Sequence, residues 1–103
     1  MSHVKTKEEA NAEAQRREVE RLKELSDIRM VMSSLEGRRF VWRFLAECRV
    51  FLSTYSPEAL ESYYRQGRRS VGLLFYNDVL EACPEQFWQA QRENIKTEGN
   101  PNG

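Results

Sequence analysis

Residues 37–48 of the 103-residue chain read GRRFVWRFLAEC and have the apolar spacing of a helix. Its apolar side chains recur at the i, i+3, i+4, i+7 spacing of one helix face: Val41, Phe44, Leu45 and Cys48. Phe40 and Trp42 widen this face beyond a surface stripe. The segment therefore predicts the central core helix of an all-α protein.

Helices are expected on the N-terminal side of this segment. Residues 6–26 are rich in Ala, Glu, Lys, Arg and Gln, which are good helix formers, and Thr6 with Glu9 makes a capping box. This stretch is either a flexible amphipathic arm or a docking helix that orders on a partner. Ser26-Asp27 predicts the start of a second, short helix, and Gly37 predicts a break.

On the C-terminal side, residues 49–56 read RVFLSTYS and are interpreted as an extended connection. Ser56-Pro57 predicts a helix start, and that helix is expected to end near Gly67. Another helix is predicted from Arg68 to Ala82, with one apolar face made by Val71, Leu74, Phe75 and Val79. Cys83-Pro84 predicts a further restart.

These elements predict an all-α fold, a small bundle of four to five short helices with an extended charged N-terminal helix. Three parts are expected: a helical arm over 1–26, a helical core domain over 27–94 and a disordered polar tail over 95–103. The aromatic side chains expected to fill the core are Phe40, Trp42, Phe44, Phe75, Phe87 and Trp88.

Charge is balanced over the chain, with 16 basic and 16 acidic residues, which argues against coating of nucleic acid by net charge alone. The distribution is uneven. Residues 27–76 contain eight arginines against five acidic residues, a net charge of +3, whereas residues 77–94 have a net charge of −3. The sequence therefore predicts an Arg-rich body with an acidic end.

Two segments begin alike, GRRFVWRFL at 37–45 and GRRSVGLLF at 67–75. If each glycine begins a helix, the arginine pairs lie in a first turn, where cations oppose the helix dipole at a cost of about 0.3–1 kcal/mol each. A bridging carboxylate or a bound anion would offset this cost. Arg38, Arg39, Arg68 and Arg69 are thus either internal ion-pair partners or a contact surface for acidic protein or phosphate.

Tyr63, Tyr64 and Arg65 form a second candidate contact surface, because tyrosine and arginine are favoured both in protein interfaces and in base stacking. No catalytic residue, metal ligand or cofactor-binding residue is predicted, and we do not expect an enzyme. The one histidine is His3, and Cys48 and Cys83 stand 35 positions apart, which removes the usual nucleophilic and zinc arrangements. Both cysteines are expected to be reduced and buried, and no apolar run approaches the roughly 18 residues of a membrane span.

The segments LSDIRMVMSSLEGRRFVWRFLAECRVF and QGRRSVGLLFYNDVLEACPEQFWQAQREN, within residues 22–94, resemble a family of small tailed-bacteriophage proteins. This is the Bordetella-phage-type domain found among the head and portal genes of podovirus-like phages. The resemblance covers both GRR motifs and the Cys-Pro-Glu turn, but neither the N-terminal arm nor the tail. It implies no catalytic residue and no cofactor.

The function implied by the resemblance is that of a structural or accessory protein of the virion or its assembly, in the head interior or near the portal or tail. It would act by binding phage structural proteins (portal, capsid or tail) and could form a homo-oligomer. Its expected location is the virion or the cytoplasm of the infected cell. Two alternatives stay open: a nucleic-acid-binding or DNA-ejection accessory protein, which is not favoured, and a modulator of a host protein.

Overall fold

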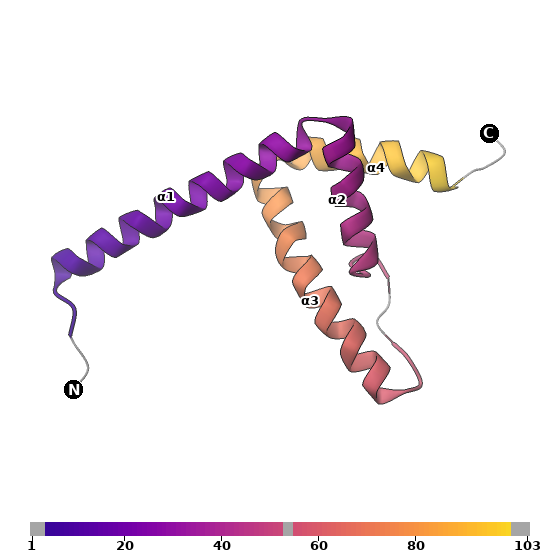
Figure 1. Cartoon of the computed structure of the whole chain (residues 1–103), viewed down its shortest axis with the longest axis horizontal. Helices are drawn as coiled ribbons and strands as arrows, with labels where there is room; N and C mark the ends of the chain where they lie inside the picture. Colours follow the sequence, from indigo (N-terminus) through magenta and orange to yellow (C-terminus); the bar gives the residue numbers. More distant parts are fainter. Residues whose placement is uncertain (1–3, 53–54, 100–103) are drawn as a thin grey trace.

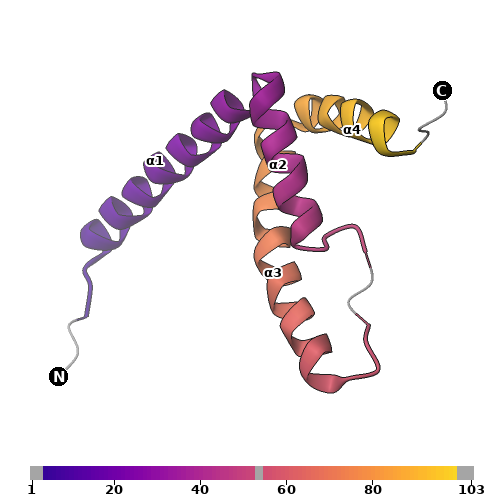
Figure 2. The ribbon, with the colours of Figure 1, turned by 45° about the vertical axis from the view of Figure 1, so that its right-hand side comes forward.

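The computed structural model describes residues 4–52 and 55–99 of the chain. Over these residues it contains four helices and no strand: α1 (Lys7–Met32), α2 (Leu35–Glu47), α3 (Ala59–Ala82) and α4 (Pro84–Gly99). The predicted all-α class is therefore confirmed, with α1 as the extended N-terminal helix. Helices α2 and α3 run side by side in opposite directions, and α1 and α4 leave the same end of this hairpin in different directions (Figures 1 and 2).

The molecule is elongated, with principal extents of 64 × 39 × 15 Å and a radius of gyration of 18.6 Å. A compact domain of about 100 residues has a radius of gyration of about 13 Å. Most of the difference comes from α1, which projects away from the hairpin as a single rod (Figure 1). Much of the surface of the chain therefore lies outside any intramolecular interface.

Helix α1 begins as predicted, because Thr6 is its N-cap and its hydroxyl accepts a hydrogen bond from the Glu9 amide at 3.1 Å. The predicted second helix from Ser26-Asp27 is wrong, since α1 continues without a break to Met32. Both polar residues are exposed on the continuing helix, while Leu25 and Met32 are buried. The burial of this face thus keeps α1 continuous through Ser26-Asp27, although the local capping signals there favour the start of a new helix.

A tight corner joins α1 to α2. Ser34 caps α2 by accepting a hydrogen bond from the Gly37 amide at 2.9 Å, so Gly37 lies inside the first turn and is not a break between helices. A Cβ atom on this glycine would lie 1.7 Å from the Val31 carbonyl oxygen. Only glycine therefore allows the last turn of α1 to approach α2 this closely.

Helix α2 ends in a Schellman motif. The Arg49 amide bonds the Ala46 carbonyl at 2.9 Å and the Val50 amide bonds the Leu45 carbonyl at 3.2 Å. Arg49 has φ 59°, the left-handed conformation in which glycine is the usual residue. Residues 49–52 are thus turns and a bend, in place of the predicted extended connection, and residues 53–54 lie outside the described residues.

Helix α3 starts at Ala59, two residues later than the Pro57 start predicted, although the Ser56 hydroxyl still accepts from the Glu58 amide at 3.3 Å. The predicted end near Gly67 is wrong, because α3 runs unbroken to Ala82. One glycine lowers helix stability by about 1 kcal/mol, which a 24-residue helix with a packed face tolerates. The predicted restart at Cys83-Pro84 is confirmed by α4.

The core lies at the end of the hairpin where the four helices meet. Its buried members are Met32, Trp42, Leu45, Cys48, Val50, Val79, Cys83, Phe87 and Ala90. Phe51 reaches into it from the turn, with its ring 5.0 Å from that of Trp42. Cys48 and Cys83 are both free and buried, as predicted.

Of the six aromatic residues predicted for the core, Trp42 and Phe87 are buried. The prediction is wrong for Phe40, Phe44, Phe75 and Trp88, which are 36–58% exposed. Helix α4 extends to Gly99, so residues 95–99 are helical although they were assigned to the disordered polar tail over 95–103. Residues 100–103 and His3 lie outside the described residues.

Candidate functional site

An apolar groove opens between the last turns of α1 and the α2–α3 hairpin. Its volume is about 350 Å³. The lining side chains are Asp27, Ile28, Val31, Met32, Phe40, Val41, Phe44, Phe75 and Val79. Three of the aromatic residues expected in the core are therefore found in the wall of a surface groove.

The aromatic wall of the groove is held by ring packing. Phe44 of α2 and Phe75 of α3 meet edge to face, with ring centroids 5.7 Å apart. The Arg43 guanidinium lies 5.8 Å from the centroid of the Phe40 ring, at the outer edge. Edge-to-face pairs and a cation over a ring both fix the orientation of aromatic side chains, so the wall has a defined shape.

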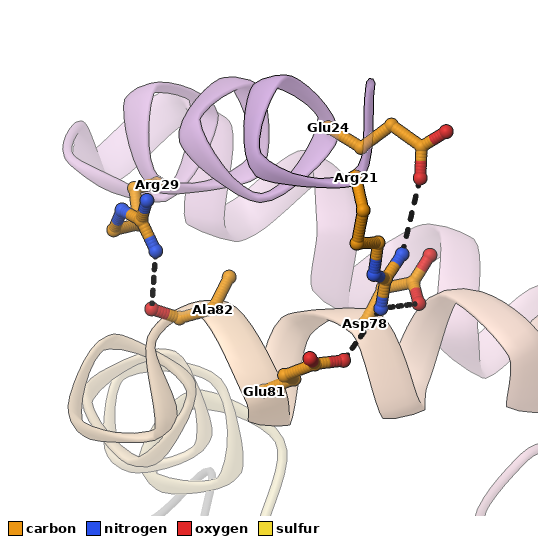
Figure 3. A network of polar contacts seen from close by, with 6 residues as sticks. All are labelled: Arg21, Glu24, Arg29, Asp78, Glu81 and Ala82. Carbon is orange, nitrogen blue, oxygen red and sulfur yellow. Dashed lines mark hydrogen bonds and ion pairs between the residues drawn. The ribbon is translucent and has the colours of Figure 1, made fainter. Parts of the chain in front are cut away.

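Polar contacts fix the angle between α1 and α3 beside the groove (Figure 3). The Arg21 guanidinium donates to Asp78 at 2.7 Å and to Glu81 at 2.6 Å, and also to Glu24 at 3.1 Å. These carboxylates raise the pKa of Arg21, with the hydrogen bond to Asp78 contributing most. Five residues after Glu24, Arg29 donates to the Ala82 carbonyl at 3.3 Å.

The Arg21 network was not predicted. Its partners are 57 and 60 positions away in the sequence, and each carboxylate belongs to an ordinary charged helix pattern. The net acidic character of residues 77–94 was the one signal in the sequence that α3 offers carboxylates to a basic partner.

Arg38 of the first GRR motif is buried, with 8% of its surface exposed. It donates to both carboxylate oxygens of Glu93 on α4, at 2.9 and 3.0 Å, and to the Met32 carbonyl at 3.1 Å. The hydrogen bonds lower the pKa of Glu93 and raise that of Arg38. Arg38 therefore joins α2 to α4 and to the end of α1, through a carboxylate that the sequence did not single out.

The other three arginines of the GRR motifs have different surroundings. Arg39 is exposed on α2. Arg68 lies 3.5 Å from Glu47 and its guanidinium is 5.5 Å from the Tyr64 ring centroid. Arg69 donates to the Val50 carbonyl at 3.5 Å. Neither glycine begins a helix, because Gly67 lies within α3 and Gly37 is the third residue of α2. Of the four arginines, Arg38 alone lies about one turn from a helix start, and the two motifs are not copies of one structural unit.

The second candidate surface lies on the first half of α3. Tyr63 and Tyr64 are 69% and 65% exposed. Arg65 is half-buried instead, since it donates to the Tyr55 carbonyl at 3.1 Å and pairs with Glu61. The structure thus places both tyrosines at the surface and uses Arg65 to hold the segment that precedes α3.

Within residues 4–52 and 55–99, we find no group of three or more His, Cys, Asp and Glu side chains that could hold a metal ion. None of the helices described is long and apolar enough to cross a membrane. The arrangement that the structure does offer is an apolar groove whose wall includes the exposed rings of Phe40, Phe44 and Phe75.

The chain was compared with known proteins. No curated protein and no solved structure matches it. A family model described as Bbp19-like phage protein matches residues 28–92, which include both GRR motifs and every groove-lining residue except Asp27. This match confirms that the chain is related to a phage protein family, as expected. The chain belongs to the Bbp19-like phage protein family.

Proposed function

We propose that this phage protein is a structural or assembly component of a tailed-phage particle, in the head interior or beside the portal or tail, and acts by protein–protein binding. The observation that carries the proposal is the apolar groove. Phe40, Phe44 and Phe75 present aromatic surface there, and a solitary globular domain would bury such side chains.

The groove suits a helix or a short apolar segment of another phage protein. An amphipathic helix that lies in a hydrophobic groove inserts a few large side chains at i, i+3 or i+4 spacing. Aromatic anchors in preformed pockets contribute most of the affinity in such contacts. The Arg21 network holds α1 against α3 at one side, so the groove exists before a partner arrives and little ordering is needed on binding.

The nucleic-acid alternative rested on the Arg-rich middle of the chain. Arg38 is paired with Glu93, Arg65 with Glu61 and Arg68 with Glu47, so much of this charge has an internal partner. The alternative still makes a distinct prediction, namely DNA binding that weakens steeply as salt rises. The host-protein alternative predicts one stoichiometric host partner and no copies in particles.

The experiment is mass spectrometry of purified phage particles, with the copy number measured against the capsid protein. We compare wild type with Phe40→Glu, which places a charge in the groove, and with Leu22→Glu as the control. Leu22 is 56% exposed, similar to Phe40 at 58%, but lies outside the groove. We expect a fixed copy number for wild type and Leu22→Glu, and loss of Phe40→Glu from particles.

Two results would contradict the proposal in different ways. Absence of the wild-type protein from particles removes the virion role and favours assembly or host binding. Normal incorporation of Phe40→Glu would show that the groove is not the surface that attaches the protein.

A further inference from the structure

The α1 side of the groove has acidic side chains at its edge. Asp27 is the one charged residue among the described side chains that line the groove. Within the part of the chain that the structure describes, its carboxylate has no ion-pair partner. Glu24 lies three residues before Asp27, on the same face of the helix. The apolar surface on this side therefore borders on carboxylates.

The Arg21 network leaves the α1 side with an excess of negative charge (Figure 3). The Arg21 guanidinium is shared by three carboxylates. With Asp27 and Arg29, the cluster has four carboxylates and two guanidinium groups, which is a net charge of −2. The cations do not neutralise all the carboxylates, so the electrostatic potential on this side is negative.

The α2 side of the groove carries two arginines instead. Arg39 and Arg43 lie about one helical turn apart, and with Glu36 and Phe40 they line a hollow of about 250 Å³. Phe40 also lines the groove, so the hollow and the groove share this ring. Glu36 reduces the net charge of this side to +1. The two sides of the groove thus differ in the sign of their charge.

These two arginines have no internal counter-charge. In the described part of the chain, neither Arg39 nor Arg43 has a carboxylate within 4.0 Å, whereas Arg38 is paired with Glu93. Like charges at i, i+4 spacing destabilise a helix. The fold therefore carries two uncompensated cations beside an aromatic ring, and a partner that supplies carboxylates would compensate them.

The groove itself accepts side chains and not the body of a helix. Its volume of about 350 Å³ is near the low end of the range of about 300–1,000 Å³ for pockets that bind small molecules. A helix that lies along such a groove inserts a few large apolar side chains, and the residues that border its apolar stripe lie over the two sides. The charges on the two sides therefore select the charges that border the stripe.

We propose that the partner segment is an amphipathic helix of another phage protein, with basic residues along the α1 side of its apolar stripe and acidic residues along the α2 side. This inference rests on the proposed function, because it specifies the partner of the same groove. Opposite signs on the two sides also fix the direction of the helix, since a reversed helix brings like charges together. Nucleic acid fits this site less well, because the α1 side repels phosphates and a phosphate backbone does not cover apolar rings.

The test uses three synthetic helical peptides with the same length and the same leucine stripe. The mixed peptide has lysines along one border of the stripe and glutamates along the other, whereas the second has only lysines and the third only glutamates. Their dissociation constants with the full chain are measured by fluorescence anisotropy at low salt. We expect wild type to bind the mixed peptide about tenfold more tightly than either of the others, and this difference to shrink as salt screens the charges.

Charge reversal on either side should change which peptide binds best. Asp27→Lys places a cation in the α1 wall and should favour the glutamate peptide. Arg39→Glu combined with Arg43→Glu makes the α2 side acidic and should favour the lysine peptide. Since each variant is expected to bind one peptide more tightly than wild type does, loss of folding cannot produce this result.

Arg16→Glu combined with Arg17→Glu is the matched control. Both arginines are exposed on the projecting part of α1 and lie outside the groove. The control changes the net charge of the chain by the same amount as reversal of Arg39 and Arg43, and it should keep the preference for the mixed peptide.

Any of three results would overturn the inference: no binding of the peptides by wild type, equal binding of all three, or an unchanged preference after charge reversal. Loss of duplex DNA binding in the Arg39 and Arg43 variant, without any peptide preference, would assign these arginines to nucleic acid instead. The virion role is tested separately by the composition of particles. A clear peptide preference with no protein in purified particles contradicts only the virion role, whereas loss of Phe40→Glu from particles without a peptide preference contradicts only this inference.

Discussion

Gly72 and Gly67 lie five residues apart in α3, and the same substitution should change stability in opposite directions at the two positions. Gly72 is buried where the turn after α2 crosses α3. A Cβ at residue 72 would lie 2.4 Å from the Cys48 Cβ and 2.6 Å from a methyl of Val50, whereas a Cβ at residue 67 would meet open space.

At each position, the direction of the change in stability follows from two effects. Replacing glycine by alanine within a helix stabilises it by up to about 1 kcal/mol. At residue 72, carbon atoms that need about 3.5–4.0 Å would be more than 1 Å too close. The Cys48 Cβ is fixed to the backbone and cannot rotate away, so we expect the upper end of overpacking penalties, about 3 kcal/mol.

Gly72→Ala should therefore destabilise the protein by about 2 kcal/mol and lower Tm by roughly 8–16 °C. Gly67→Ala should raise Tm by up to roughly 4–8 °C. Thermal unfolding followed by circular dichroism measures both, at low protein concentration so that association contributes least. A Gly72→Ala variant as stable as wild type would refute the close crossing of the 48–50 turn over α3.

Glu93→Gln tests the buried ion pair between Arg38 and Glu93. Arg38 lowers the pKa of Glu93 in the folded state, so the pair stabilises the folded protein fully above the ordinary pKa of 4.5. This stabilisation is lost as pH falls through the lowered pKa. Urea unfolding of both proteins should show the largest difference near neutral pH and a shrinking one below pH 4.5; a constant difference would contradict the pairing. Burial raises the pKa of the Cys83 thiol, so Ellman's reagent should label folded protein only as fast as the structure opens, and immediate labelling would contradict the burial. Arg49→Gly should stabilise the protein by up to about 1 kcal/mol in urea unfolding, because glycine adopts the left-handed conformation of residue 49 without strain, and a loss of stability would show that the Arg49 side chain matters more than its backbone.

The helical class could be predicted because it depends on local patterns. Thr6 and the Cys83-Pro84 pair mark real helix boundaries, and both use hydrogen bonds or steric effects within a few residues. Ser26-Asp27 and Gly67 carry similar local signals and yet lie inside helices. Packing of the whole helix outweighs a local preference of about 1 kcal/mol at such positions.

The candidate site could be predicted only in part. Tyr63 and Tyr64 are exposed as a contact surface requires, and Arg38 has the kind of carboxylate partner expected for a cation in the first turns of a helix. The groove was missed because apolar residues lie on more than one face of α2. Periodicity identifies both faces of such a helix as apolar, but it cannot say that Trp42 packs on Phe87 of α4 while Phe40 lines the open groove.

The two long helices, α1 and α3, differ in how much apolar surface they expose to water. The first four turns of α1 have charged side chains around small apolar ones, and the buried residues of α1 are Leu25 and Met32 near its end. The first half of α3 instead exposes Leu60, Tyr63 and Tyr64 to water, while the buried residues of α3, Gly72 and Val79, lie in its second half. A charged helix remains soluble alone, whereas an apolar stripe on a helix that is already anchored gains stability only when another surface covers it. The four helices therefore meet at one packed core, and the groove and the exposed face of α3 are the surfaces where we expect a partner to bind.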